Sequence, residues 1–228
     1  MKKLTTLLIL FFATGTMLAE ISTTQKNALV DFYHATNGDS WNNSWDLTTS
    51  PDTWHGVTIQ DGQVVGISLL FNNLSGTLPA SLSDLTALKT LELSFNKLEG
   101  SLPASLGSLS QLEVLAINGN ALNGIIPSSI GQLAQLKQLH LSSNQLEGSI
   151  PAQFSSLKAL EVLNLFDNNL SGKVPAGLAN CANLKQVLLA ENELHADFDF
   201  STIVLSAGAS LDLTPKQDTA PITMNNGN

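Results

Sequence analysis

The residues that could perform nucleophilic or metal chemistry are few and scattered. The chain has one cysteine, Cys181, and four histidines, at positions 34, 55, 140 and 195. A Cys–His nucleophile needs an imidazole within hydrogen-bonding reach of the thiol, and the 24-residue repeat described below brings no histidine beside Cys181. One cysteine also excludes a disulfide framework and a cysteine-based zinc site, which need several. We therefore expect Cys181 to be a small buried hydrophobic residue.

Other motifs of catalysis are absent from the sequence. The segment Glu193–Asp199 contains acids and a histidine, but its spacing matches no known metal site, so a solvated turn is expected there. The sequence has no glycine-rich phosphate loop, no serine nucleophile elbow and no HExxH pattern. It predicts a protein that is not an enzyme and that holds neither a metal nor a cofactor.

The charge of the chain excludes several kinds of partner. Its 228 residues include 10 lysines and no arginine against 19 Asp and Glu, for a formal net charge of −9. Binding to nucleic acid or to anionic lipid requires basic side chains that neutralise phosphates. The chain has no such basic region, so nucleic-acid binding is excluded.

Both ends of the sequence differ from its middle. Residues 1–19, MKKLTTLLILFFATGTMLA, have two lysines, a short apolar run and then small residues, the layout of a secretory signal peptide. An uncleaved anchor is the alternative, and no later segment is long and apolar enough to span a bilayer. Residues 214–228 have no periodicity and predict a flexible tail. We expect a protein outside the cytoplasm: secreted, periplasmic or at the cell surface.

A repeat of 24 residues fills the middle of the chain. Asparagine recurs at Asn72, Asn96, Asn120, Asn144, Asn168 and Asn192, and leucine follows each one two residues later. Glycine and proline recur in the same phase through five units, and pairs of apolar residues such as Leu91 and Leu93 precede each asparagine. Five full units and a partial sixth are thus predicted over residues 64–199.

Side-chain geometry explains the pattern. In Leu91-Glu92-Leu93 the leucines face one side of a strand and Glu92 the other. One unit cannot bury its apolar face alone, so the units must stack into a solenoid. The asparagine amides can bond to backbone groups of their own and neighbouring turns, forming a ladder. Glycine and proline then shape the return on the convex side.

The stacking distance also indicates whether two carboxylates of the concave face could act as a glycosidase pair. Glu92 and Asp167 are three repeats apart, which corresponds to roughly 14 Å for strands spaced at about 4.8 Å. Glycosidases place their two carboxyl groups about 5 to 9.5 Å apart. The spacing therefore argues against catalysis by this pair.

The motif resembles a known family. Residues 96–103 (NKLEGSLP) and 144–151 (NQLEGSIP) are similar to the plant-type extracellular leucine-rich repeat, which is found in plant receptor ectodomains and polygalacturonase-inhibiting proteins. The resemblance implies an α/β solenoid: a curved right-handed superhelix with a parallel concave β-sheet and a convex side of short 3-10 or irregular segments. It also implies that partners bind on the concave sheet.

Residues 20–63 are expected to form an N-terminal cap. Residues 25–35 place apolar side chains on one helical face, and Trp41, Trp45 and Trp54 resemble the aromatic cap of these proteins. Many relatives have cysteines around the last tryptophan, where this chain has Asp52 and Ile59. Cap packing is the predicted role of the tryptophans, and an exposed sugar-stacking platform is the alternative. At the other end, residues 200–213 are expected to form an irregular C-terminal cap.

The outward strand positions supply the predicted binding surface. Exposed aromatic residues with polar neighbours are typical of binding hot spots, although the phenylalanines could instead shield the strand edge. The candidate residues on the concave face are Phe71, Glu92, Phe95, Asn118, His140, Asn164, Phe166 and Asp167.

These observations predict a secreted, non-catalytic recognition module for a protein or peptide partner, with glycan left open. One alternative is an inhibitor of extracellular polysaccharide-degrading enzymes, as in the polygalacturonase inhibitors. The other is a glycan- or surface-binding adhesin, or an ice-binding protein, which would need a flat and regular Thr/Asn/Ser face. The convex positions Ser75, Glu99, Asn123, Glu147 and Ser171 carry too much charge for such a face.

Overall fold

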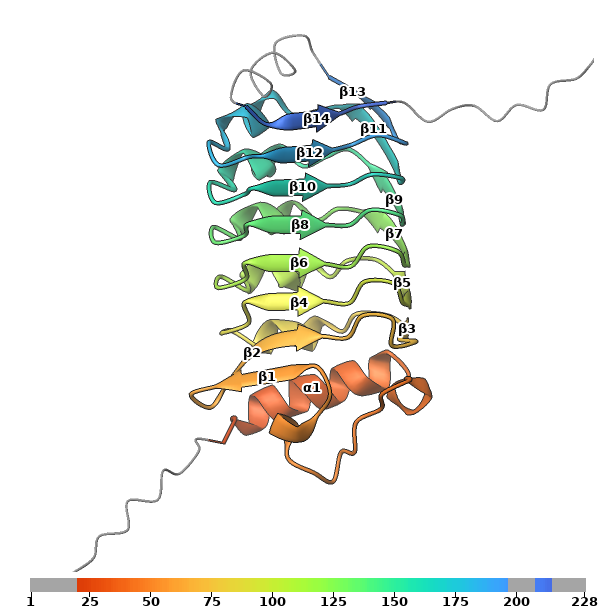
Figure 1. Ribbon diagram of the computed structural model, residues 1–228, viewed down its shortest axis with the longest axis vertical. Coiled ribbons are helices and arrows are strands. Elements are labelled where there is room, and N and C mark those ends of the chain that lie inside the picture. Colours follow the sequence, from red (N-terminus) through yellow and green to blue (C-terminus); the bar gives the residue numbers. More distant parts are fainter. Residues whose placement is uncertain (1–19, 197–207, 215–228) are drawn as a thin grey trace, which may run out of the picture.

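The protein is a solenoid of stacked coils, seen in a computed structural model that describes residues 20–196 and 208–214 (Figure 1). Each repeat passes through a strand, a second short strand and a 3-10 helix before the next coil begins. The predicted signal segment, residues 200–207 of the predicted C-terminal cap and all of the predicted tail except Thr214 lie outside the described residues.

The first sheet forms the front of the molecule in Figure 1. Within the described residues it has eight strands: β1 (Val57–Gln60), β2 (Gln63–Ser68), β4 (Thr90–Glu92), β6 (Val114–Ala116), β8 (Gln138–His140), β10 (Val162–Asn164), β12 (Gln186–Leu188) and β14 (Ser210–Asp212). β1 pairs antiparallel with β2, and all later pairs are parallel. The register repeats every 24 residues, as in Leu91↔Leu115.

A second parallel sheet follows each turn after the asparagine. Its six described strands are β3 (Ser75–Gly76), β5 (Lys97–Gly100), β7 (Ala121–Ile125), β9 (Gln145–Gly148), β11 (Asn169–Lys173) and β13 (Glu193–His195). The repeats close through the 3-10 helices η3 (Ala80–Asp84), η4 (Ala104–Ser108), η5 (Ser128–Gln132), η6 (Ala152–Ser156) and η7 (Ala176–Asn180). The solenoid with 3-10 turns is as predicted from the sequence. The second sheet was not predicted, because one inward residue per strand gives no alternating pattern.

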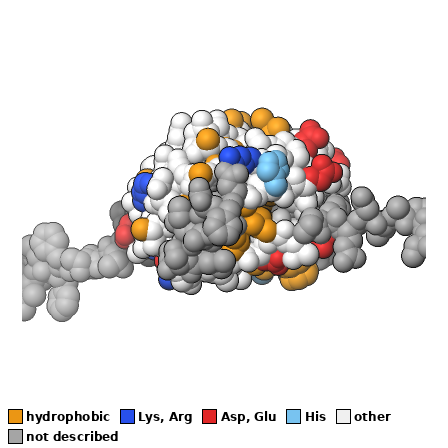
Figure 2. Space-filling model, turned by 90° about the horizontal axis from the view of Figure 1, so that it is seen from above, with side chains coloured by type: hydrophobic (Ala, Val, Ile, Leu, Met, Phe, Trp, Pro, Cys, Tyr) orange, Lys and Arg blue, Asp and Glu red, His pale blue; other side chains and the backbone are white. Residues whose placement is uncertain are grey.

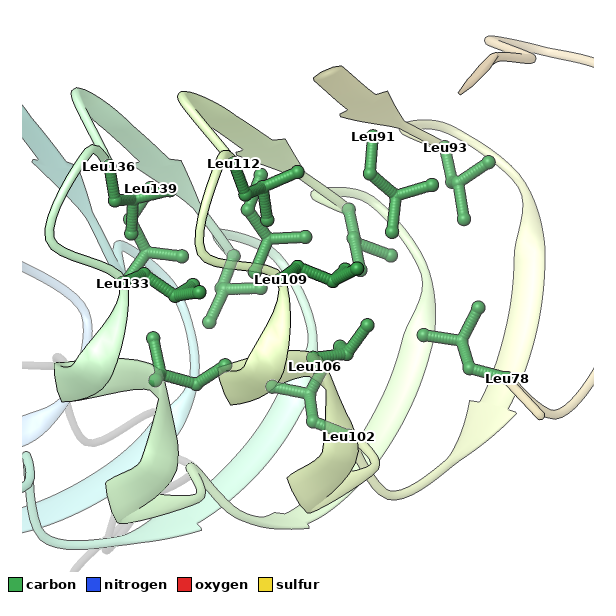
Figure 3. Packing of buried hydrophobic residues seen from close by; sticks show 14 of the residues in the cluster. Leu78, Leu91, Leu93, Leu102, Leu106, Leu109, Leu112, Leu133, Leu136 and Leu139 are labelled. Carbon is green, nitrogen blue, oxygen red and sulfur yellow. The ribbon is translucent and has the colours of Figure 1, made fainter. Parts of the chain in front are cut away.

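The leucine columns form one continuous interior. Leu91, Leu115, Leu139 and Leu163 are fully buried, one on each successive strand of the first sheet. Figure 3 shows that leucines of the strands and of the 3-10 side, such as Leu106 and Leu109, point into the same space. Each buried leucine contributes about 1.5–3 kcal/mol relative to an exposed one, so adjacent coils stabilise one another.

The repeat asparagines connect neighbouring coils by hydrogen bonds. Asn144 illustrates the arrangement, because its Nδ2 donates to the carbonyls of Leu141 (3.1 Å) and Ser142 (3.2 Å) in its own coil and of Ile117 (3.0 Å) in the preceding coil. Its Oδ1 accepts a hydrogen bond from the backbone N–H of Leu122 at 3.0 Å. These bonds satisfy backbone groups at the turn, and one of them, the Ser142 carbonyl, also accepts from the backbone N–H of Gly119 in the neighbouring coil.

The N-terminal cap begins with helix α1 (Thr23–Ala35), whose N-cap Ser22 accepts a hydrogen bond from the Gln25 N–H. The side chain of Gln25 is buried, and its Oε1 accepts from the backbone N–H of Val64 at 2.8 Å. This contact joins the helix to strand β2. Two short 3-10 segments, η1 (Gly38–Ser40) and η2 (Pro51–Thr53), lead from the helix to β1.

The three tryptophans lie inside this cap. Trp41, Trp45 and Trp54 are 5%, 4% and 3% exposed, so the predicted cap packing is correct and the exposed sugar-stacking platform is wrong. Trp45 and Trp54 stack with ring centroids 4.9 Å apart, and each indole N–H donates to a backbone carbonyl. Because the indole N–H groups are hydrogen-bonded and the rings bury apolar area against one another, the cap can cover the first coil without a disulfide.

The C-terminal segment differs from the irregular cap expected over residues 200–213. Its described end contains β14, which pairs in parallel with β12 and continues the 24-residue register, for example Val187↔Leu211. Leu211 and Leu213 therefore occupy the phases of Val187 and Leu189 and pack against the core. The strand was missed because this unit lacks the Asn, Gly and Pro signals of the others.

An alternating row of charges runs beside the first sheet. The row is Lys89, Glu113, Lys137, Glu161 and Lys185. Two ion pairs lie within it: Lys137 Nζ is 2.6 Å from Glu113 Oε2, and Lys185 Nζ is 2.5 Å from Glu161 Oε2. Lys185 lowers the pKa of Glu161 through its hydrogen bond and its charge, with a smaller contribution from Lys137.

We expect reversal of one charge in this row, Glu161→Lys, to lower the midpoint of thermal unfolding at low salt by placing three lysines in succession. The difference from the wild type should shrink as salt screens these exposed charges. Glu147→Lys is the matched control, since Glu147 is exposed on β9, outside the row. Equal effects of the two variants would show that the row itself has no role in stability.

Candidate recognition surface

The outward side of the first sheet, with the two or three residues that follow each strand, is here called the concave face. Its residues lie in four rows, each running from coil to coil in steps of 24 residues. The strands contribute the row from Gly66 to Ser210 and the row Ser68, Glu92, Ala116, His140, Asn164, Leu188 and Asp212. The next two rows are Leu70, Ser94, Asn118, Ser142, Phe166, Ala190 and Thr214, and Phe71, Phe95, Gly119, Ser143, Asp167 and Glu191.

The concave face carries negative charge and no lysine among its described residues. Its carboxylates are Glu92, Asp167, Glu191 and Asp212, and none of them forms an ion pair within the described ranges. Among residues 20–196 and 208–214, the two ion pairs Lys137–Glu113 and Lys185–Glu161 lie in the charged row beside the sheet. Figure 2 looks down on the end of the solenoid, where basic side chains (blue) and acidic side chains (red) lie at the surface.

Phe71 and Phe95 form an exposed aromatic pair on this face. Their rings are parallel within 5° and their centroids are 4.5 Å apart, yet Phe71 is 65% and Phe95 47% exposed. A small hollow beside them is lined by Asn42, Phe71, Asn73, Phe95, Asn96 and Lys97. Large aromatic groups left in water are typical of contact sites.

The two phenylalanines also adopt an unusual backbone conformation. The last row of the face is left-handed at every described position, with φ of 51° at Phe71, 59° at Phe95 and 50–56° at Ser143, Asp167 and Glu191. Glycine adopts this conformation at no steric cost, whereas other residues lose roughly 1–2 kcal/mol. Only Gly119 among the described residues of the row avoids this cost.

The other candidate residues are partly engaged in local hydrogen bonds. Asn118 Oδ1 accepts from Ser94 Oγ at 2.8 Å, and Asn164 Oδ1 accepts from the backbone N–H of Phe166 at 3.2 Å. Glu92 Oε2 accepts from Ser68 Oγ at 3.0 Å. Their remaining polar capacity faces solvent, because Glu92, Asn118 and Asn164 are only half-buried.

The structure brings some of the candidates together and separates others. Phe71 stacks on Phe95, and Glu92 and His140 flank Ala116 in one row. Phe166, 37% exposed, and Asp167 are consecutive residues three repeats from Phe95. The face is therefore an extended surface with distinct ends, and its carboxylates do not converge on one point.

His140 has a lowered pKa, because burial penalises its charged form more than Glu92 stabilises it. The unfolded chain, with an ordinary histidine pKa near 6.5, then binds the proton more readily than the folded one. We expect folding stability to decrease as the pH falls through 6.5. His140→Gln should lose less stability between pH 7 and pH 5 in urea unfolding, and an equal loss in both proteins would contradict this role of His140.

One exposed apolar residue was missed in the sequence. Ile125, 63% exposed, lies on β7 in the second sheet, at a position that is Thr77, Ser101, Ser149 or Lys173 in the other coils. Comparing the residues at this position of the repeat could have identified Ile125, since it is the one large aliphatic residue among them. It lies apart from the exposed apolar residues of the concave face, of which Phe71 and Phe95 are stacked on each other.

Cys181 and the histidines show no arrangement for catalysis in the described part of the chain. Cys181 is 3% exposed, its thiol donates to the Phe154 carbonyl at 3.4 Å, and burial raises its pKa. Residues 20–196 and 208–214 contain no group of three or more His, Cys, Asp or Glu that could hold a metal ion. The same residues include no helix of the length and hydropathy needed to cross a membrane.

Comparison with known proteins identifies the family. A family model described as a leucine-rich repeat region matches residues 69–199. The chain belongs to the leucine-rich-repeat family. The repeats and stacked sheets of this leucine-rich-repeat protein agree with that assignment.

The similar proteins include plant receptors. Over 76 residues the chain is 45% identical to the receptor protein-tyrosine kinase CEPR2 of Arabidopsis thaliana, a match covering 32% of this chain but only 8% of the receptor. The ectodomain of the Arabidopsis receptor kinase HAESA, solved with an IDA peptide hormone ligand, is 30% identical with a TM-score of 0.69, over 84% of this chain and 32% of that one.

A plant ice-binding protein is also similar in structure to this leucine-rich-repeat protein. The TM-score is 0.70 at 24% identity, over 86% of this chain and 72% of that one. At this identity the likeness concerns the fold alone. The second sheet here exposes Glu99 and Glu147 among its outward residues, so its surface is not a uniform array of small polar groups.

Proposed function

We propose that this leucine-rich-repeat protein is a non-catalytic, extracellular recognition module that binds a protein or peptide partner on its concave face. The observation that carries the proposal is the exposed Phe71–Phe95 stack. These rings are 65% and 47% exposed, and a partner that covered them would gain the corresponding hydrophobic free energy.

Three further features support the proposal. The concave face has small residues at its centre, Ala116, Gly119 and Ser143, which leave room for a bound chain. The HAESA ectodomain, which is similar over most of this chain, was solved with a peptide hormone. The predicted signal segment at residues 1–19 would place the module outside the cytoplasm.

The proposal is tested by substitutions on opposite sides of the solenoid. The concave variant combines Phe95→Ala, His140→Ala and Phe166→Ala. The control combines Gln132→Ala, Gln153→Ala and Ser156→Ala, at exposed positions of the 3-10 side. Each immobilised protein is exposed to the extracellular medium of the host, and the captured proteins and peptides are quantified by mass spectrometry.

We expect at least one partner to be captured by the wild type and the control, and to be reduced tenfold or more on the concave variant. Circular dichroism and the unfolding midpoint establish that both variants are folded. Capture that is unchanged by the concave substitutions, or lost equally in the control, would overturn the concave-face assignment. If the captured partner degrades polysaccharides, an assay of its hydrolysis with added protein decides whether the module is an inhibitor.

A further inference from the structure

The row of left-handed residues on the concave face changes its chemistry along the solenoid. At its N-terminal end lie the stacked Phe71 and Phe95, in the middle Gly119 and Ser143, and at the C-terminal end Asp167 and Glu191. All six stand at equivalent positions of successive coils. A partner that follows the row therefore meets an apolar end, a shallow middle and an acidic end.

The apolar end is an anchor for one bulky side chain. The Phe71 and Phe95 rings face each other, so their edges and the free face of the pair remain in water, next to the hollow lined by Asn42 and Asn73. An aliphatic or aromatic group placed there would bury apolar area against both rings. The Nδ2 groups of Asn42 and Asn73 already donate to the backbone carbonyls of Phe71 and Ser40. Lys97 also lines the hollow, so the basic residue of a ligand is not expected at this end.

The middle of the row keeps the path open. The Phe95 ring lies over Gly119, and a Cβ atom at position 119 would come within 2.7 Å of Phe95 Cδ1. Glycine is thus favoured here both by the ring, which a Cβ atom would meet, and by the left-handed backbone, whose φ is +66°. Ser143 follows with a small exposed side chain. An extended main chain that follows the row therefore crosses the Phe95 ring at Gly119 and then the small side chain of Ser143.

The acidic end places two carboxylates on neighbouring coils. Strands stack at about 4.8 Å, so Asp167 and Glu191 are like charges at close range, and neither has an ion-pair partner within residues 20–196 and 208–214. Neighbouring like charges repel. A cationic side chain between them would remove this repulsion and gain a charge-assisted hydrogen bond.

The geometry of the row sets the spacing that a ligand must have. Asp167 is three coils from Phe95 and Glu191 is four, which corresponds to about 14 and 19 Å at 4.8 Å per coil. An extended peptide advances about 3.3 Å per residue. The two features of the ligand should therefore be about four to six residues apart.

From these observations we infer that the partner contributes an extended basic peptide to the left-handed row. A bulky apolar residue of this peptide packs on Phe71 and Phe95, and a lysine or arginine four to six residues away binds between Asp167 and Glu191. The inference rests on the proposed function and names the chemistry of the bound segment. An acidic peptide, a nucleic acid or an anionic membrane would be repelled by the same carboxylates.

The experiment uses a random 12-residue peptide display library, which is selected on the full 228-residue chain. The selection at about 50 mM salt is repeated on Asp167→Asn/Glu191→Gln, which removes both charges while keeping side-chain size. Asparagine tolerates left-handed backbone, so the first change is compatible with the fold. The matched control is Glu99→Gln/Glu147→Gln, which removes two exposed charges from the second sheet.

We expect the selected peptides to share a Phe, Leu, Ile or Trp and a Lys or Arg four to six positions away. Synthetic copies should bind the Asp167→Asn/Glu191→Gln variant at least tenfold more weakly than the wild type or the second-sheet control. Their affinity should also decrease as salt increases.

Selection of peptides without basic residues, or equal affinity for the charge-neutral variant, would overturn the inference. If such peptides still lose binding to the Phe95→Ala, His140→Ala, Phe166→Ala variant, the proposed function stands while the basic-peptide inference fails. If no selected peptide depends on any concave residue, or none is enriched, both fail.

Discussion

Replacement of Asn144 by alanine should lower the free energy of unfolding by at least about 3 kcal/mol. The substitution leaves the buried N–H of Leu122 without its acceptor and removes three donated hydrogen bonds. A buried unsatisfied donor costs about 1–3 kcal/mol, and each lost hydrogen bond about 0.5–1.5 kcal/mol more. The measurement is equilibrium unfolding in urea, followed by circular dichroism.

Asn123→Ala is the matched control, because Asn123 is one coil away and its side chain is exposed on β7. The control should change stability by less than about 0.5 kcal/mol. If Asn144→Ala and Asn123→Ala have the same small effect, the asparagine ladder does not hold adjacent coils together.

Trp45→Ala should have the largest effect of any single change in the cap, about 3–5 kcal/mol. Trp45 is 4% exposed, stacks on Trp54 and contacts the rings of Phe32, Tyr33 and Trp41. Its removal creates a cavity in the cluster and leaves the His55 carbonyl without the indole donor. Without the packed cap the first coil would be exposed to solvent. The urea unfolding midpoint of the protein should therefore decrease.

The exposed Phe71 provides the comparison for this experiment. Phe71→Ala removes a ring that is 65% exposed, so it should change stability by less than about 1 kcal/mol while weakening any concave-face interaction. A stability loss for Phe71→Ala as large as that for Trp45→Ala would mean that the Phe71 ring is part of the packed structure and not a free contact surface.

The extent to which sequence predicts this protein differs between its parts. The 24-residue period predicts the interior, since Leu91 and its equivalents can be buried only by stacking. The second sheet could not be predicted in this way, because strands such as Lys97–Gly100 bury one residue, Leu98, and are held by bonds to neighbouring coils. Strand β14 could not be predicted for a similar reason. Leu211 keeps the 24-residue spacing from Val187, but its unit lacks the Asn, Gly and Pro residues that mark the other units.

Predicting which surface residues are neighbours depends on their position within the 24-residue repeat as well as on their type. Phe71 and Phe95 differ by 24 positions, and this spacing alone predicts neighbours on adjacent coils, as their stacked rings show. The left-handed backbone of the row could not be predicted, because five of its six described residues are not glycine. The engagement of Asn118 and Asn164 in local hydrogen bonds likewise depends on distances that the sequence does not contain.

The most direct test of the account is hydroxyl-radical footprinting of the protein with and without a bound partner. The exposed side chains Phe71, Phe95 and Phe166 report on the concave face, and Ile125 reports on the second sheet. We predict that the partner reduces oxidation of the three phenylalanines and leaves Ile125 unchanged. Protection of Ile125 with unchanged oxidation of the phenylalanines would contradict the concave face as the recognition surface.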